Sequence, residues 1–163
     1  MADIRYDGRV AVITGAGGGL GRSYALQLAA RGAKVVVNDH GGSADGQGND
    51  TRAADEVVAE IEAAGGEAVA NYDSVSTAEG GERIVQTALD SFGGVDIVIN
   101  NAGILRDSSI PKMSSDNFDI LIDVHLKGAF YVAQPAFRYM KENAYGRVVY
   151  TASAAGLFGN FGQ

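Results

Sequence analysis

The sequence predicts an α/β fold built on a doubly wound, Rossmann-type parallel sheet. Short β-branched apolar runs alternate along the chain with segments of helical periodicity, which is typical of βαβ units. Several of these runs are apolar throughout, as expected for strands buried on both faces. A glycine-rich stretch follows the first run and opens the first helical segment. We therefore expect a single dinucleotide-binding domain over residues 1–163, with about five strands in the flavodoxin-like order 3-2-1-4-5.

The predicted strands and helices can be placed from apolar runs and helix-ending glycines. The strands are expected at 10–14, 34–38, 67–73, 95–100 and 147–153, and the helices at 20–31, 51–64, 76–93 and 115–143. The first three helices stop at Gly32, Gly65 and Gly93. Ser76 and Glu79 form a capping-box pattern at the start of the third. The fourth should kink near Pro135, which cannot donate a backbone hydrogen bond.

Composition narrows the class of function. A hydrophobic content of 46% in 163 residues is enough for one buried core. The net charge of −7 argues against nucleic acid or an anionic membrane as a partner. The absence of cysteine excludes disulfides and thiolate metal sites and suits a reducing compartment, and we expect no metal site. No apolar run is long enough to span a membrane, and the N-terminus lacks the order of a signal peptide. A soluble, cytoplasmic protein is expected.

The stretch "TGAGGGLG" from Thr14 to Gly21 is a candidate phosphate-binding turn. Glycines let the chain turn tightly and bring backbone N–H groups close to a diphosphate, and the helix N-terminus adds partial positive charge. The alternative is a glycine-rich turn that binds nothing, but the strand–turn–helix context favours a dinucleotide. The segment 40–50, "HGGSADGQGND", is predicted to be a flexible connector.

Asp39 ends the second predicted strand. A carboxylate at that place accepts hydrogen bonds from the adenosine ribose hydroxyls and repels a 2′-phosphate. The alternative is an ordinary solvated acidic residue. Because Gly18 puts no basic side chain in the glycine turn, the sequence favours NAD over NADP.

These features together resemble the short-chain dehydrogenase/reductase family. The resemblance rests on Thr14-Gly-x-x-x-Gly19-x-Gly21, on "NNAG" at 100–103 and on "GRVVYTAS" at 146–153. The stretches "NDHGG", "AVANYDSV", "NNAGILRD", "VHLKG" and "GNFGQ" are similar to one branch, the (3R)-hydroxyacyl-CoA dehydrogenase domain of peroxisomal multifunctional enzyme type 2 and its bacterial relatives. The resemblance covers the whole chain. It implies NAD-dependent oxidation or reduction at the 3-hydroxy or 3-oxo position of an acyl-CoA or a similar secondary alcohol.

The resemblance also implies roles for individual residues. The glycines would hold the diphosphate, Asp39 the ribose, Asp73 and Ser74 the adenine, while Asn101 would brace the sheet beside the cofactor. The implied cofactor-binding residues are Thr14, Gly15, Gly19, Leu20, Gly21, Asp39, Asp73, Ser74, Asn101, Ala102 and Gly103.

Two residues are implied for catalysis. Ser153 matches the serine that hydrogen-bonds the substrate oxygen. His125 stands where most of the family has an asparagine in a proton relay, and a lone helix histidine is more often structural, which is the interpretation we favour.

The family pattern continues from "GNFGQ" to a tyrosine followed four positions later by a lysine, which lowers the tyrosine pKa for proton exchange with substrate. None of the seven tyrosines of this chain has a lysine four positions on. We therefore expect the 163 residues to be inactive on their own. Two hypotheses stay open: a dehydrogenase seen as a fragment or truncated relative, and a non-catalytic dinucleotide-binding or oligomerising module.

The long predicted helix is apolar on two sides. One stripe, suited to the sheet, contains Phe118, Leu121, Ala129, Val132, Ala136 and Met140, and the other contains Leu126, Phe130, Ala133 and Phe137. In the family this helix packs against its symmetry mate, so we expect a homo-oligomer, a two-fold dimer through helix 115–143. The alternative is that the segment 154–163 folds back over the second stripe.

Overall fold

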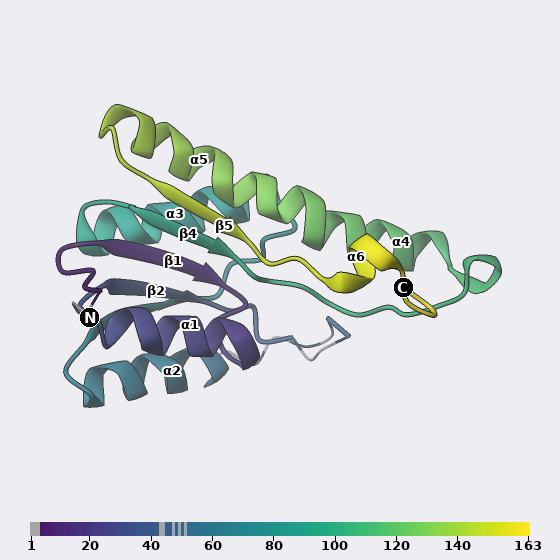
Figure 1. The fold of residues 1–163 in the computed structure, drawn as a ribbon, viewed down its shortest axis with the longest axis horizontal. Coiled ribbons are helices and arrows are strands. Elements are labelled where there is room, and N and C mark those ends of the chain that lie inside the picture. The colour runs from purple at the N-terminus through teal and green to yellow at the C-terminus, as the bar shows by residue number, and fades with distance from the viewer. Residues whose placement is uncertain (1–3, 43–44, 47, 49, 51) are drawn as a thin grey trace.

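A computed structural model describes residues 4–42, 45–46, 48, 50 and 52–163. Its strands form one parallel sheet in the order β3-β2-β1-β4-β5 (Figure 1). The strands are β1 Val10–Thr14, β2 Lys34–Asn38, β3 Glu67–Asn71, β4 Ile97–Asn100 and β5 Arg147–Tyr150. The predicted fold class and strand order are confirmed. The last three strands are shorter than predicted at one end.

Helices cover both faces of the sheet (Figure 1). Helices α1 (Gly19–Ala29) and α2 (Arg52–Ala63) pack on one face, and α3 (Ala78–Phe92) and α5 (Gly128–Glu142) pack on the other. Successive strand residues point to opposite faces, so Ile13 packs toward α1 and α2 while Val12 packs toward α3 and α5. The central strands need apolar side chains at every position because both faces are covered.

Some helix ends lie where the sequence predicted them and others do not. Thr77, and not Ser76, is the N-cap of α3, with its Oγ1 accepting a hydrogen bond from the Gly80 N–H at 3.0 Å. The predicted capping box is therefore wrong by one residue. Gly93 ends α3 in the left-handed conformation, as predicted. The predicted start of α2 at Thr51 and part of the predicted connector 40–50 lie outside the described residues.

The long predicted helix is divided into α4 (Ser115–Ile122), a π-helical turn η2 (Asp123–Lys127) and α5. The regular α pattern is interrupted at η2, whereas α5 runs through Pro135, where the sequence predicted a kink. Pro135 leaves the Tyr131 carbonyl without its usual donor. Gly81 of α3 packs against that carbonyl so closely that a Cβ there would lie 2.4 Å from its oxygen. This close packing supports the helix at its weak point.

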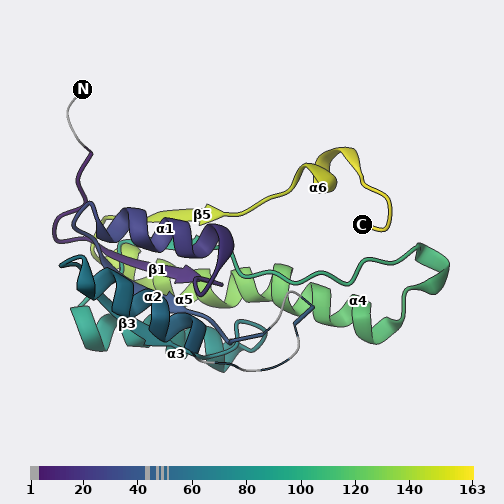
Figure 2. The same cartoon turned by 90° about the horizontal axis from the view of Figure 1, so that it is seen from below.

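Beyond β5 the chain forms a short helix that the sequence did not predict, α6 (Ala154–Phe158). The chain then runs beside the segment that follows β4, away from α5 (Figure 2). The Ser108 N–H donates to the Gly162 carbonyl at 2.9 Å, and Gln163 Nε2 donates to Asp107 Oδ2 at 3.1 Å. The C-terminal segment therefore packs against the loop after β4.

The two apolar stripes of the long helix differ in burial. Val132, Ala136 and Met140 are buried against the sheet, as predicted. Phe118 is exposed, because α4 extends beyond the carboxyl ends of the strands (Figure 2). Phe130 and Phe137 are 55% and 61% exposed. The alternative that the C-terminal segment covers this second stripe is thus wrong.

Candidate functional site

A cavity of about 690 Å³ lies at the carboxyl ends of the strands β1 to β4. Its walls are the glycine turn after β1 and the segments that follow β2, β3 and β4. This is the edge at which open parallel sheets bind ligands, and the volume falls within the range of about 300–1,000 Å³ for small-molecule sites. The structure brings together at this cavity the predicted residues Gly15, Gly19, Asp39, Asp73, Ser74, Asn101, Ala102 and Gly103. Thr14, Leu20 and Gly21 do not line it.

The glycines of the turn serve two different purposes. A Cβ on Gly21 would lie 2.1 Å from the Gly15 carbonyl oxygen, and one on Gly15 would lie 2.9 Å from Ala102 Cα. These two positions need glycine because backbone packs against backbone. At Gly18 and Gly19 nothing lies within 4 Å of the Cβ position. That open ledge at the start of α1 fits a diphosphate, whose charge is stabilised by free N–H groups and the helix dipole.

Thr14 and Asn101 join the turn after β1 to the turn after β4. Thr14 Oγ1 accepts hydrogen bonds from the N–H groups of Asn101 and Ala102, each at 3.0 Å. Asn101 Nδ2 donates to the carbonyls of Thr14 and Gly15, each at 3.1 Å. The bracing role that the resemblance implied for Asn101 is therefore present in the geometry. Thr14 does not line the cavity itself, but its hydrogen bonds hold the wall residues Asn101 and Ala102 in place.

Asp39 is fixed by the backbone on both sides. Its Oδ2 accepts the Gly17 N–H and its Oδ1 accepts the Gly41 N–H, both at 2.8 Å. Each carboxylate oxygen has further acceptor capacity, so the side chain can still receive hydroxyl donors from a ligand. It also holds the glycine turn in place.

The cavity wall is acidic. Three carboxylates line it, those of Asp39, Asp50 and Asp73, and the described lining residues include no lysine or arginine. A hydrogen bond from Arg52 lowers the pKa of Asp50 to about 2. Other residues that line the cavity were not predicted as site residues, among them His40, Ile120 and Val124. His40 and Val124 lie in the stretches "NDHGG" and "VHLKG", whereas Ile120 belongs to no motif. A wall with this charge suits a ligand that presents hydroxyl and amino donors.

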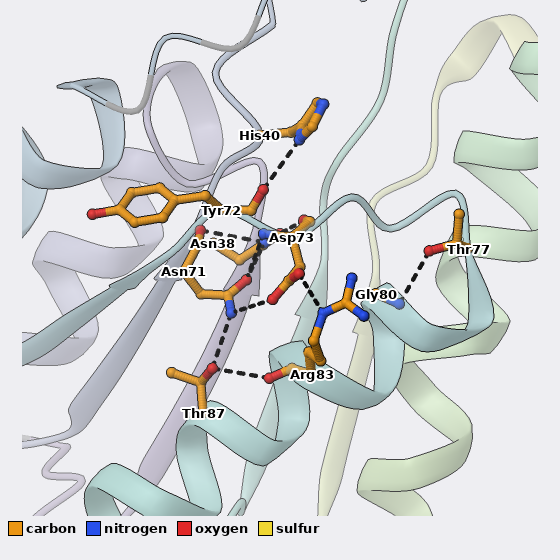
Figure 3. A network of polar contacts seen from close by, with 9 residues as sticks. All are labelled: Asn38, His40, Asn71, Tyr72, Asp73, Thr77, Gly80, Arg83 and Thr87. Carbon is orange, nitrogen blue, oxygen red and sulfur yellow. Dashed lines mark hydrogen bonds and ion pairs between the residues drawn. The ribbon is translucent and has the colours of Figure 1, made fainter.

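Asp73 belongs to a polar network at the ends of β2 and β3 (Figure 3). Asn38 Nδ2 donates to Asn71 Oδ1 at 2.8 Å and to the Asp73 carbonyl at 2.9 Å. Asn71 Nδ2 donates to Asp73 Oδ2 at 3.0 Å, and Arg83 Nε donates to Asp73 Oδ1 at 2.6 Å. Both oxygens of this carboxylate are thus held in place.

The two residues implied for catalysis do not line this cavity. Ser153 is exposed, and its Oγ accepts the Ala155 N–H at 3.1 Å as the N-cap of α6. His125 Nε2 lies 2.9 Å from the Ile104 carbonyl oxygen and 3.1 Å from the Ile104 nitrogen. This contact ties η2 to the segment after β4, which supports the structural interpretation of His125.

Comparison with known proteins agrees with this architecture. A family model described as short chain dehydrogenase matches residues 9–163. The chain belongs to the short-chain dehydrogenase family. It is 60% identical over 160 residues to peroxisomal multifunctional enzyme A of Dictyostelium discoideum, covering 98% of this chain and 36% of that protein. Among the described residues, no helix has the length and apolar character needed to cross a membrane.

Two solved structures are also similar. A short chain dehydrogenase from Mycobacterium avium superposes with a TM-score of 0.86 at 48% identity, covering 96% of this chain and 58% of that one. Full-length peroxisomal multifunctional enzyme type 2 from Drosophila melanogaster superposes with a TM-score of 0.79 at 50% identity. The match covers 98% of this chain and 25% of that one. The chain therefore spans less than two thirds of the length of these relatives.

Proposed function

We propose that this chain binds NAD(H) in the cavity at the carboxyl ends of β1 to β4. The observation that carries the proposal is the composition of that cavity: an open glycine ledge at the start of α1 on one side and a fixed carboxylate, Asp39, on another, with no lysine or arginine among the described lining residues. The ledge would hold the diphosphate and Asp39 the adenosine ribose. Asp73 and Ser74 would lie at the adenine, and the segment 101–103 at the other end of the cofactor.

Titration calorimetry with NAD and with NADP tests the proposal. We expect NAD to bind more tightly, because the Asp39 carboxylate repels a 2′-phosphate. Equal or tighter binding of NADP would remove Asp39 from this role. Failure of both dinucleotides to bind would contradict the proposed site.

The reaction that we propose for the whole protein is NAD-dependent oxidation or reduction at the 3-hydroxy or 3-oxo position of an acyl-CoA or a similar secondary alcohol. This choice is supported by relatives named peroxisomal multifunctional enzyme and peroxisomal hydratase-dehydrogenase-epimerase. When bound, the nicotinamide ring supplies a hydride acceptor or donor, and Ser153 would bind the reacting oxygen of the substrate.

For residues 1–163 alone we propose binding without turnover. No tyrosine among them has a lysine four positions on, and Ser153 Oγ caps α6. General acid catalysis is typically worth about 10²–10⁴-fold in rate. Purified protein should therefore not oxidise NADH with acetoacetyl-CoA, and clear turnover would point to a proton donor outside the family pattern.

We also propose a two-fold dimer through the exposed side of the α4–α5 helix, which favours an oligomerising role as the second candidate function.

For location we propose the cytoplasm, since a chain without cysteine suits a reducing compartment. Several relatives are named as peroxisomal, so the peroxisome is the competing location. Cell fractionation separates the two, and recovery with peroxisomal markers would contradict the cytoplasmic proposal.

A further inference from the structure

We propose that Arg83 is a positioning residue that fixes the Asp73 carboxylate to accept the 6-amino group of a purine, and so makes the cavity selective for adenine. The proposal rests on the proposed function and deepens it, because it assigns base selectivity to a residue that does not itself line the cavity. It follows from the way in which Asp73 is held.

The backbone of Asp73 is anchored to the sheet. Its N–H donates to Asn71 Oδ1 at 3.0 Å and its carbonyl accepts from Asn38 Nδ2 at 2.9 Å. The two asparagines lie at the ends of neighbouring strands and are buried. The position of the Asp73 main chain is therefore set without Arg83.

The carboxylate is held from two directions (Figure 3). Asn71 Nδ2 donates to Asp73 Oδ2, and the same amide group donates to Thr87 Oγ1 of α3 at 2.9 Å. Arg83, also on α3, donates from Nε to the other oxygen, Oδ1, at 2.6 Å and forms an ion pair with it. Without it, the carboxylate would be held through Oδ2 alone and would turn more freely about its Cβ–Cγ bond. The arginine thus sets the direction in which the remaining lone pairs of Asp73 point.

The chemistry of a carboxylate explains the selectivity. An ionised carboxylate only accepts hydrogen bonds. The 6-amino group of adenine donates, whereas the 6-oxo group of hypoxanthine accepts, so the two bases differ at the atom that a fixed acceptor can recognise. A site built to pair with a donor rejects an analogue that lacks it.

Exposure makes the test practicable. The side chain of Arg83 is 60% exposed and that of Asp73 is 24% exposed, so removing the guanidinium leaves the core intact. A matched control is Arg138 of α5. Its side chain is equally exposed, and it pairs with Glu82 of α3 instead of with Asp73.

The experiment compares the dissociation constants of NAD and of nicotinamide hypoxanthine dinucleotide. Wild type should prefer NAD by about tenfold, the value of one well-placed hydrogen bond to a charged group. Arg83→Gln should bring this ratio close to one, Arg83→Lys should give an intermediate ratio because an ammonium lacks the planar geometry of a guanidinium, and Arg138→Gln should leave it unchanged.

Each other outcome has a definite meaning. A wild type that binds neither dinucleotide overturns the proposed function, and this inference with it. A wild type that prefers NAD, together with an Arg83→Gln protein that keeps the same ratio, overturns the inference alone. An equal loss of affinity for both dinucleotides with a lowered melting temperature would make Arg83 merely structural, and would also overturn it.

Discussion

Gly18 and Gly21 stand in the same turn but have opposite surroundings. The Cβ position of Gly18 is open, whereas that of Gly21 lies 2.1 Å from the Gly15 carbonyl oxygen and 2.6 Å from Asn101 Nδ2. Gly21→Ala should therefore destabilise the protein by about 1–3 kcal/mol, as overpacking of a fixed backbone does. Gly18→Ala is the control and should stay within about 0.5 kcal/mol of wild type. Urea unfolding of both variants measures the difference, and equal stabilities would contradict the packing role of Gly21.

The motif predicted that Gly21 must be glycine, but it did not predict the close packing that requires it. The atoms that crowd Gly21 include one from Asn101, which is distant in the sequence. Similarly, Asp39 could be predicted from its place after β2, but its two bonds to backbone N–H groups depend on the fold of the turn. Arg83 carries no motif. Its role depends on where α3 lies relative to the end of β3.

Among the elements, α3 and α5 are in close contact at Gly81 and Tyr131. A Cβ on Gly81 would lie 2.4 Å from the Tyr131 carbonyl oxygen, the atom left without its helical donor by Pro135. Gly81→Ala should separate the two helices and cost about 1–3 kcal/mol. Gln86→Ala, at an exposed position of α3, is the control. Thermal unfolding tests both, and a Gly81→Ala protein as stable as wild type would show that the helices are free to move apart.

The strands were predictable from their continuous apolar runs, and the helices that pack on them from apolar residues at helical spacing. The π-helical turn η2 was not, because its geometry depends on contacts made across the fold, among them the contact of His125 with Ile104. Helix α6 escaped prediction because it has five residues and little periodicity. Phe118 was predicted to pack on the sheet but is exposed. The sequence does not show where the strands end and α4 continues without a sheet beneath it.

Considered as a whole, the molecule has an uncovered apolar face. This face, formed by Leu126, Phe130 and Phe137, is exposed, and β5 lies at an edge of the sheet. We expect a dimer through this face, because leaving each large side chain in water forgoes about 1.5–3 kcal/mol. Light scattering after size exclusion should show a dimer for wild type and a monomer for Phe130→Glu with Phe137→Glu.

The matched control for the dimer is Leu157→Glu with Phe158→Glu, which changes two exposed apolar residues of α6. It should stay dimeric. A wild type that is monomeric at tens of micromolar would contradict the dimer. A dimer lost in the α6 variant instead would move the interface to the C-terminal segment.

Amide chemical-shift mapping of isotope-labelled protein on addition of NAD locates the bound dinucleotide. We expect the shifts to be concentrated at the carboxyl ends of the strands, in the segments 15–21, 39–41, 73–76 and 101–104 that surround the cavity. Shifts concentrated instead at the groove between α1 and α2, beside Glu60 and Gly66, or no shifts with NAD in excess, would contradict binding in the cavity.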